Sequence, residues 1–214
     1  MSIAAVVVAA GHGRRFGGAK QFSLFDGESV AARSVRTARS VASYVVLVVP
    51  ENYEGNGEGA DLIVTGGASR AASVRAGLAH CGDAEIVVVH DAARPLASAA
   101  LFHSVVDAVR AGADAAIPGL TPTDTIKRVT SDGEETLVLS TLARDELVAV
   151  QTPQAFRRDV LARAHEDQGD ASDDAALVEA LGARVVVVDG EVDNVKITHL
   201  RDIDVLGIVE RSRP

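Results

Sequence analysis

The chain has few of the residues that usually mark a redox, zinc or membrane protein. Its 214 residues include one cysteine, Cys81, one methionine and no tryptophan, and aromatic residues make up only 3%. A single cysteine excludes an internal disulfide and any zinc site built from several thiolates. Cys81 lies near the end of a predicted helix, where a small core residue fits better than a nucleophile. The longest apolar runs have the length of strands, which excludes a membrane-spanning helix.

Positive charge is scarce compared with negative charge, and the formal net charge is −9 at pH 7. Proteins that coat nucleic acid gain most of their affinity by neutralising backbone phosphates, so this balance argues against a nucleic-acid partner. Any anionic ligand must therefore meet a local cluster of cations. The first residues lack the basic start and long apolar stretch of a signal peptide, and we expect a cytoplasmic location.

Lysine is rare even among the cations. The chain has 18 arginines but only three lysines, Lys20, Lys127 and Lys196. A coding bias towards arginine accounts for most of this skew. Where arginine is so freely used, however, a lysine can mark a position that needs a compact ammonium group.

Short apolar runs alternate with helical patterns along the whole chain, which is long enough to form one α/β domain over residues 1–214. This alternation predicts a Rossmann-like, doubly wound and mostly parallel sheet. Ligands of such sheets bind beyond the carboxyl ends of the strands. Strands are predicted at residues 3–8, 44–49, 62–64, 85–90, 115–120 and 184–188. Helices are predicted at residues 29–41, 69–80, 97–111, 157–166, 174–181 and 200–211.

Residues 121–149 interrupt this alternation. Strand-like segments at 125–129 and 137–139 flank the turn Ser131-Asp132-Gly133, which predicts a hairpin arm outside the main sheet. An isolated two-stranded arm has little stability of its own. We therefore expect the arm to pack against a second copy of the chain.

The first predicted strand leads directly into a glycine-rich turn that carries Arg14, Arg15 and Lys20. Glycines allow backbone N–H groups to approach an anion closely, and the three cations can neutralise a polyphosphate. Phe16 occupies the third glycine position of the dinucleotide-binding fingerprint, which disfavours an NAD-binding protein, and the Gly-Lys-Ser/Thr ending of a P-loop is missing. The turn therefore predicts a phosphate-binding loop of another kind.

Three further charged segments follow predicted strands. HDAARP at 90–95 supplies Asp91 and Arg94, GGASRAAS at 66–73 opens a helix, and DNVKIT at 193–198 supplies Lys196. Taken singly, these segments fit a capping aspartate, an ordinary helix start and a solvated lysine. Because they share one edge of the predicted sheet, a common anion-binding site is the better interpretation.

Six motifs in this order carry a resemblance to a known family: AAGHGRR…AKQ (9–21), GGASRAASV (66–74), HDAARP (90–95), DTIKR (124–128), QTPQAF (151–156) and DNVKIT (193–198). Together the motifs cover nearly the whole length. The chain resembles 2-C-methyl-D-erythritol 4-phosphate cytidylyltransferase. The resemblance implies a Rossmann-like fold of the nucleotide-diphospho-sugar transferase type with a dimerisation arm. It also implies an enzyme that joins CTP to methylerythritol phosphate and releases pyrophosphate.

The resemblance also assigns roles to residues. It implies that Arg15 and Lys20 stabilise the transition state, while Lys196 and Arg144 position the methylerythritol phosphate. Mg²⁺ is implied as cofactor, held mainly by the triphosphate and by no protein ligand directly. The remaining implied contacts are Ala10, Gly11, Gly13, Gly67, Ser73 and Asp91 for CTP, and Arg94, Thr125 and Thr152 for the acceptor.

Two residues depart from the family pattern. Ala19 stands where proline is common in the family, and Ala68 stands where an acidic residue often helps to hold the cytosine. Because of Ala68, the sequence does not decide how strongly CTP is preferred over other nucleotides. A ribitol-5-phosphate cytidylyltransferase has a similar scaffold, although HDAARP favours the methylerythritol enzyme. A non-catalytic nucleotide-binding regulator is the alternative from another class. The grouping of Arg15, Lys20, Arg144 and Lys196 argues against it, because a pure binder does not need cations around a bond being made.

Overall fold

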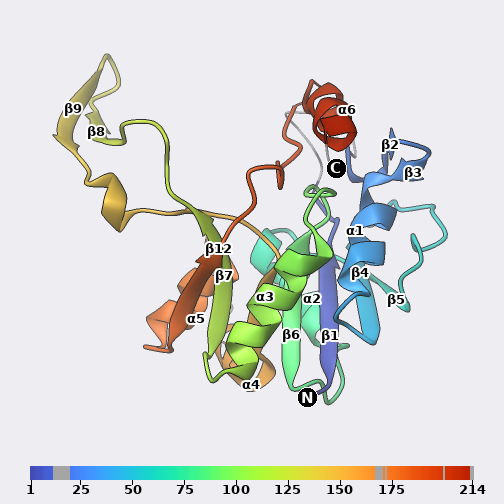
Figure 1. Ribbon diagram of the computed structural model, residues 1–214. Coiled ribbons are helices and arrows are strands. Elements are labelled where there is room, and N and C mark those ends of the chain that lie inside the picture. The colour runs from blue at the N-terminus through green and yellow to red at the C-terminus, as the bar shows by residue number, and fades with distance from the viewer. Residues whose placement is uncertain (12–19, 167–170, 172, 200, 213–214) are drawn as a thin grey trace.

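The computed structural model describes residues 1–11, 20–166, 171, 173–199 and 201–212. Its core is an eight-stranded sheet in the order β10-β7-β11-β6-β1-β4-β5, with β12 paired to β7 on the other side. Figure 1 shows the central strands β7, β6, β1 and β4 of this sheet. The strands are β1 (Ile3–Val8), β4 (Tyr44–Val49), β5 (Leu62–Thr65), β6 (Ile86–Asp91), β7 (Ala115–Leu120), β10 (Ala149–Val150), β11 (Gln154–Arg157) and β12 (Val185–Asp189).

The centre of the sheet consists of short valine- and alanine-rich strands. β1 pairs in parallel with β4 on one side and with β6 on the other, and β6 is buried at every residue. Strands covered on both faces lose the alternation of polar and apolar residues, as these sequences do. The expected doubly wound, mostly parallel α/β sheet is confirmed.

Helices cover both faces of the sheet. α1 (Val30–Ala38) and α3 (Ala99–Arg110) pack against one face, where alternate residues of β1 such as Ala5 and Val7 contribute to the core. α2 (Arg70–Leu78), α4 (Arg158–Ala164) and α5 (Asp174–Ala180) cover the other face, which receives Ala4 and Val6. α6 (Asp202–Ser212) packs with Leu206 into a smaller apolar cluster near the carboxyl edge.

Several helices begin one or two residues later than the sequence pattern predicts, because a polar side chain caps each of them. Ser29, Ser69 and Ser98 cap α1, α2 and α3, and each accepts a hydrogen bond from a backbone N–H in the first turn. Asp173 caps α5 in the same way. An N-cap residue has extended backbone angles, so it lies just outside the helix that it begins.

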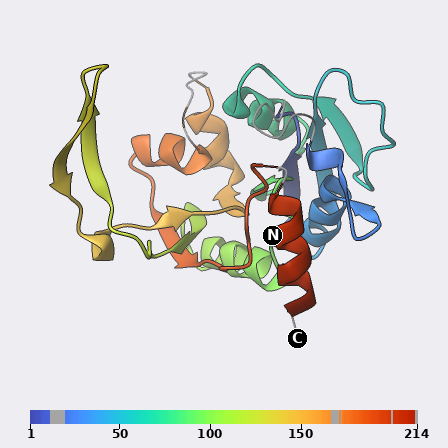
Figure 2. The same cartoon turned by 90° about the horizontal axis from the view of Figure 1, so that it is seen from above.

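The predicted hairpin arm is present. β8 (Lys127–Ser131) and β9 (Thr136–Thr141) pair with each other and with no other strand that the structure describes, and all their residues are exposed. A short 3₁₀ turn, η2 (Arg144–Glu146), follows. The arm projects away from the sheet in both Figure 1 and Figure 2.

Some elements of the fold were not predicted from the sequence. β11 runs antiparallel between β6 and β7, and β10 leads into it. A small hairpin, β2 (Leu24–Phe25) with β3 (Glu28–Ser29), follows the turn η1 (Lys20–Phe22). Within the described segments, no helix is both long and apolar enough to cross a membrane.

Candidate active site

The carboxyl edge of the sheet holds a cavity of about 530 Å³ between the end of β1, the turn η1 and the start of α2. Parallel strands place their carboxyl ends at one edge, so segments far apart in the sequence meet there. Of the residues that the sequence analysis assigned to the site, the cavity brings together Ala10, Gly11, Lys20, Gly67, Ser73, Asp91 and Lys196. Ala68, which replaces the acidic residue of the family, also lines it.

Two glycines shape the turn before α2: Gly66 allows it to approach Ala10 after β1, and Gly67 allows it to close against the first turn of α2. A Cβ on Gly66 would lie 2.4 Å from the Cβ of Ala10, and a Cβ on Gly67 would lie 2.5 Å from that of Ala72. Both distances are too short for real side chains. Ser73 fixes the turn, because its hydroxyl accepts a hydrogen bond from the Gly67 N–H at 3.2 Å and donates one to the Ser69 carbonyl at 2.9 Å.

Lys20 is held over the cavity by its neighbour Gln21. The buried Gln21 amide donates hydrogen bonds to the carbonyl oxygens of Ala9 at 2.5 Å and Gly11 at 3.0 Å, which ties η1 to the end of β1. The Lys20 ammonium donates to the carbonyl of Ile197, next to Lys196. Two of the three lysines in the chain therefore meet at this cavity.

Asp91, the last residue of β6, carries the negative charge of the site. One carboxylate oxygen accepts from Arg70 Nε at 3.1 Å, and the other accepts from Lys196 Nζ at 2.5 Å. Burial opposes ionisation of this carboxyl, but the charges of Arg70 and Lys196 outweigh it and hold the pKa of Asp91 well below its usual range. Asp91 is therefore an anion that orders two cations.

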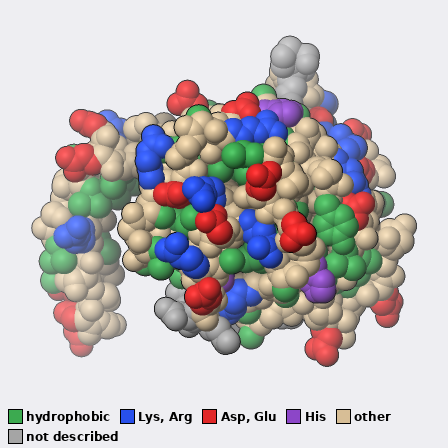
Figure 3. All heavy atoms as spheres, turned by 90° about the horizontal axis from the view of Figure 1, so that it is seen from below, with side chains coloured by type: hydrophobic (Ala, Val, Ile, Leu, Met, Phe, Trp, Pro, Cys, Tyr) green, Lys and Arg blue, Asp and Glu red, His purple; other side chains and the backbone are tan. Residues whose placement is uncertain are grey.

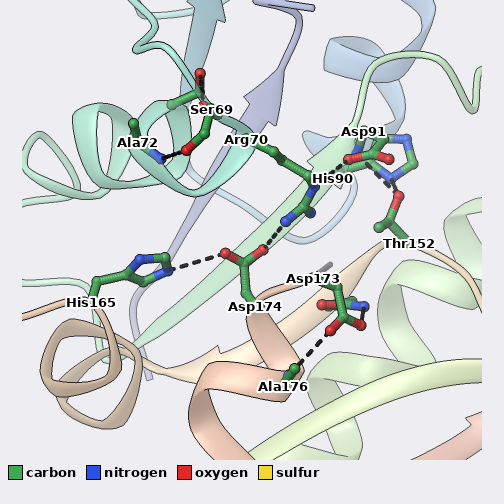
Figure 4. A network of polar contacts seen from close by, with 12 residues as sticks. Ser69, Arg70, Ala72, His90, Asp91, Thr152, His165, Asp173, Asp174 and Ala176 are labelled. Carbon is green, nitrogen blue, oxygen red and sulfur yellow. Dashed lines mark hydrogen bonds and ion pairs between the residues drawn. The ribbon is translucent and has the colours of Figure 1, made fainter. Parts of the chain in front are cut away.

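His90 and Thr152 fix the backbone next to Asp91. The Thr152 hydroxyl accepts a hydrogen bond from the Asp91 N–H at 3.0 Å and lies 3.2 Å from His90 Nδ1, as Figure 4 shows. Burial lowers the pKa of His90 to about 4, although the nearby Asp91 carboxylate acts in the opposite direction. His90 is therefore neutral at neutral pH and acts as a packed hydrogen-bonding group.

A second cavity of about 220 Å³ adjoins the first and shares Arg70, Asp91 and Lys196 with it. Arg94 and Thr152, both predicted to bind the acceptor, line this cavity. Arg94 Nη1 donates to the Asn194 carbonyl at 2.7 Å, which joins the HDAARP and DNVKIT segments. Asp91 and Lys196 therefore border both cavities.

Two predicted site residues lie elsewhere. Thr125 and Arg144 are exposed on the arm and line neither cavity, and Arg144 Nη1 donates to the Thr123 carbonyl at 2.6 Å. Gly13 and Arg15 lie outside the described residues. The carboxyl edge of a single chain therefore does not contain the two arm residues.

The amino end of the sheet has a different character. Figure 3 views the molecule from this end and shows acidic and basic side chains interspersed over the face. A cavity of about 450 Å³ lies there, lined among others by Glu85, Arg110 and Arg157, and it contains none of the predicted site residues. Throughout the described segments, no cluster of three or more His, Cys, Asp or Glu side chains could hold a metal ion.

No role was predicted from the sequence for Arg70, Asp174, Gln21 or His90. Gln21 bonds to Ala9 and Gly11 within its own motif, whereas Asp91 and Asp174, the partners of Arg70, lie outside the motif that contains Arg70. Arg70 Nη1 donates to Asp174 Oδ2 at 2.6 Å across 104 residues of sequence, as drawn in Figure 4. A single sequence gives no signal that pairs two such distant residues.

The family model described as 2-C-methyl-D-erythritol 4-phosphate cytidylyltransferase, IspD, matches residues 3–209. The chain belongs to this family. Membership confirms the resemblance that the six motifs carry, and it makes the chain a member of a family of nucleotidyltransferases.

Relatives in the family are of two lengths. A bifunctional enzyme IspD/IspF from Anaeromyxobacter dehalogenans is 45% identical over 92% of this chain and 54% of its own length. The chain therefore spans about half the length of the bifunctional relatives. A 2-C-methyl-D-erythritol 4-phosphate cytidylyltransferase from Streptomyces avermitilis is 43% identical over 94% of this chain and 88% of its own.

The fold is also that of solved family members. The crystal structure of 2-C-methyl-D-erythritol 4-phosphate cytidylyltransferase from Thermus thermophilus matches with a TM-score of 0.82 and 33% identity, over 98% of this chain and all of the other. The structure of 4-diphosphocytidyl-2C-methyl-D-erythritol synthase from Anaerococcus prevotii gives 0.81 and 28%, over 98% of each chain.

Proposed function

We propose that the chain transfers the cytidylyl group of CTP to 2-C-methyl-D-erythritol 4-phosphate and releases pyrophosphate. The observation that carries this proposal is the convergence of Lys20, Lys196 and the start of α2 on the cavity of about 530 Å³. This arrangement offers cations for phosphates beside backbone groups for a base, in a chain that belongs to the cytidylyltransferase family.

The nucleotide is placed along the carboxyl edge. Ala10 and Gly11 follow β1, and Gly67 and Ser73 shape the turn before α2, so that backbone groups on both sides can contact the base and ribose. Ala68 has only a methyl side chain and supplies no charge to this pocket. Selection of cytosine therefore rests on backbone groups, with Gly13 as a further proposed contact.

The reaction we propose is a direct displacement. A phosphate oxygen of the acceptor attacks the α-phosphorus of CTP, a new P–O bond forms, and the α–β bridging bond breaks with its electron pair leaving on pyrophosphate. Charge develops on the α-phosphate oxygens, so fixed cations are the main source of catalysis. Lys20 supplies one such cation from η1, and Arg15 is proposed as a second.

The acceptor occupies the cavity of about 220 Å³. Lys196 stands between the two cavities and is ordered by Asp91, which suits a cation that brings two phosphates together against their repulsion. Asp91 borders both cavities and so lies within reach of nucleotide and acceptor, while Arg94 and Thr152 line only the acceptor cavity. Arg144 and Thr125 are proposed to complete this pocket from the arm of a second subunit, which makes the enzyme a homodimer through residues 121–149.

Magnesium is proposed to enter with the nucleotide. Both oxygens of Asp91 already bind cations of the protein, so this carboxylate has little capacity for a metal ion. The triphosphate supplies oxygen ligands of the kind that Mg²⁺ prefers, and the ion would offset their charge. The cytoplasmic location and the single-domain organisation of residues 1–214 stay predictions.

The test is pyrophosphate release by the purified protein with CTP and Mg²⁺, run in parallel with methylerythritol 4-phosphate, ribitol 5-phosphate and no acceptor. Replacing CTP by UTP measures base selectivity in the presence of Ala68. Release that depends on methylerythritol phosphate is expected. Pyrophosphate release only with ribitol phosphate would reassign the acceptor. Binding of CTP without pyrophosphate release in any of the three reactions would favour a nucleotide-binding regulator.

A further inference from the structure

A buried acidic residue outside both cavities connects to the site. Asp174, in the first turn of α5, is completely buried. Its Oδ2 accepts from Arg70 Nη1 at 2.6 Å, and its Oδ1 lies 3.1 Å from His165 Nε2 at the end of α4 (Figure 4). A buried carboxylate costs much free energy unless it is paired, so these contacts hold Asp174 in one place.

Arg70 transmits this position to the site. Its guanidinium binds Asp174 through Nη1 and Asp91 through Nε, so one rigid, planar group joins two carboxylates from α5 and β6. The charges of both carboxylates raise the pKa of Arg70 above its ordinary value, although burial acts against this. Because the guanidinium is planar and rigid, we expect a change at Asp174 to reorient the Nε that contacts Asp91.

Lys196 is the last member of this chain of contacts. Its side chain is 44% exposed, and a long exposed lysine has many accessible rotamers. The contact to Asp91 Oδ2 at 2.5 Å selects one of them. The direction of that oxygen depends on the contact of the other oxygen with Arg70.

We propose that Asp174 is a positioning residue for Lys196, acting through Arg70 and Asp91. Asp174 lines neither cavity and contacts them only through Arg70, and it fixes the ammonium group between them. This inference deepens the proposed function of the same site, and its kinetic test rests on that function. Its spectroscopic test does not, so that failure of one can be told from failure of the other.

The rarity of lysine makes the spectroscopic test simple. Lysine labelled with ¹³C and ¹⁵N gives one side-chain signal each for Lys20, Lys127 and Lys196. Loss of a signal in Lys196→Arg assigns Lys196. Asp174→Asn keeps the size of the side chain but removes its charge, and we expect it to shift the Lys196 signal and leave that of Lys127 unchanged.

The matched control is Asp159→Asn. Asp159 is also an aspartate in the first turn of a helix paired with an arginine, Arg157, but it lies at the amino end of the sheet. The Asp159→Asn substitution should shift none of the three lysine signals. A folded Asp174→Asn variant with an unchanged Lys196 signal would overturn the proposal.

A second variant covers the case in which Asp174→Asn does not fold. Arg70→Gln removes the link between Asp174 and Asp91, and it should shift the Lys196 signal in the same direction. An unchanged signal here would overturn the proposal as well. Where both variants fold, adding Asp174→Asn to Arg70→Gln should produce little further shift, because the connection is already cut.

Kinetics distinguishes positioning from a purely structural role. We expect Asp174→Asn to lower kcat/KM for the acceptor about tenfold, since a small misplacement of a catalytic group has effects of this order or larger. In a Lys196→Ala background the same change should cost less than about threefold, because coupled residues are not additive. Equal losses in the two backgrounds would show that Asp174 only supports the fold.

Discussion

The carboxyl edge of the sheet and the arm carry similar polar residues in opposite surroundings. At the edge, β6 is buried at every residue and ends in Asp91, whose carboxylate binds two cations. On the arm, β8 and β9 are exposed at every residue, and the hairpin pairs only with itself among the described strands. Arg144 there contacts only a carbonyl of the arm among the hydrogen bonds that the structure gives it.

The difference shows where the positions of side chains come from. Residues at the edge are positioned by the core beneath them, so their geometry belongs to one chain. The arm exposes apolar side chains, including Val129, Val138 and Leu139, and it stands clear of the body in Figure 3. Exposed apolar surface of this kind is typical of an interaction face. We therefore propose that a second molecule defines the working geometry of Arg144.

The largest expected effect separates the two regions by stability. Phe156 of β11 is fully buried, and Phe156→Ala should lower the free energy of unfolding by about 3–5 kcal/mol. Leu139→Ala on the arm should change it by less than about 0.5 kcal/mol at a protein concentration low enough for monomers. Denaturant titration at low and high protein concentration checks both values. Leu139→Ala should lower the free energy of unfolding only at the high protein concentration, where the arms of two molecules pair. An equal loss in the free energy of unfolding for both variants in the monomer would show that the arm packs on the core.

The next comparison is between two lysines. Lys20→Ala should lower kcat about 10²–10³-fold, with a smaller loss of CTP affinity, because a preorganised charge acts mainly on the transition state. Arg15→Ala is expected to behave in the same way. Lys127 is exposed on β8 and bonds only to the Thr141 hydroxyl among the contacts described, so Lys127→Ala is the control with unchanged turnover. Wild-type turnover of Lys20→Ala at saturating substrates would remove Lys20 from the mechanism.

The third prediction concerns the pH dependence of the free energy of unfolding. It should arise at the carboxyl edge, where His90 lies, and not on the arm, because residues 121–149 contain no histidine. Burial lowers the pKa of His90 from 6.5 to about 4 in the folded protein, partly offset by Asp91. Between these values the unfolded chain binds more protons, so the free energy of unfolding falls as the pH decreases, by up to roughly 3 kcal/mol. Stability measured against pH should lose this slope in His90→Gln and keep it in His103→Gln, whose ring is exposed. A slope that survives in His90→Gln would contradict this assignment.

The sheet was predictable where burial dictates the sequence. The predicted strands at 3–8, 44–49 and 115–120 have the bounds found in the structure, because both faces of each are covered and few polar residues interrupt the pattern. β11 was missed because its four residues, Gln154–Arg157, mix polar and apolar side chains and pair antiparallel between two parallel strands. Its place in the sheet depends on those partners and not on its own pattern.

The site was predictable where its residues follow strands. Asp91 and Lys196 could be placed at one edge because the carboxyl ends of parallel strands coincide there. Their contact, and the link from Arg70 to Asp174, join residues separated by more than 100 positions, and no local pattern encodes such pairs. The cations and Asp91 could be recognised from the sequence, whereas the positioning roles of Gln21, Arg70 and Asp174 could not.

The arm gives the last and smallest expected effect. If the arms exchange across a two-fold axis, each site combines Lys20 and Lys196 of one subunit with Thr125 and Arg144 of the other. Lys20→Ala and Arg144→Ala homodimers would then both be inactive, because every site in them carries a defect. A heterodimer of the two variants would collect both defects in one site and leave the other intact.

Mixing equal amounts of the Lys20→Ala and Arg144→Ala proteins under conditions that allow exchange tests this arrangement. Random pairing makes half of the dimers mixed, each with one intact site of two, so roughly a quarter of wild-type activity should return. Mixing Lys20→Ala with Lys196→Ala is the control, because both residues lie at the same edge and the heterodimer has no intact site. Native mass spectrometry verifies that heterodimers form. No recovery in their presence would mean that Arg144 acts within its own subunit or has no part in the reaction, and the contrast between the two regions would then concern stability alone.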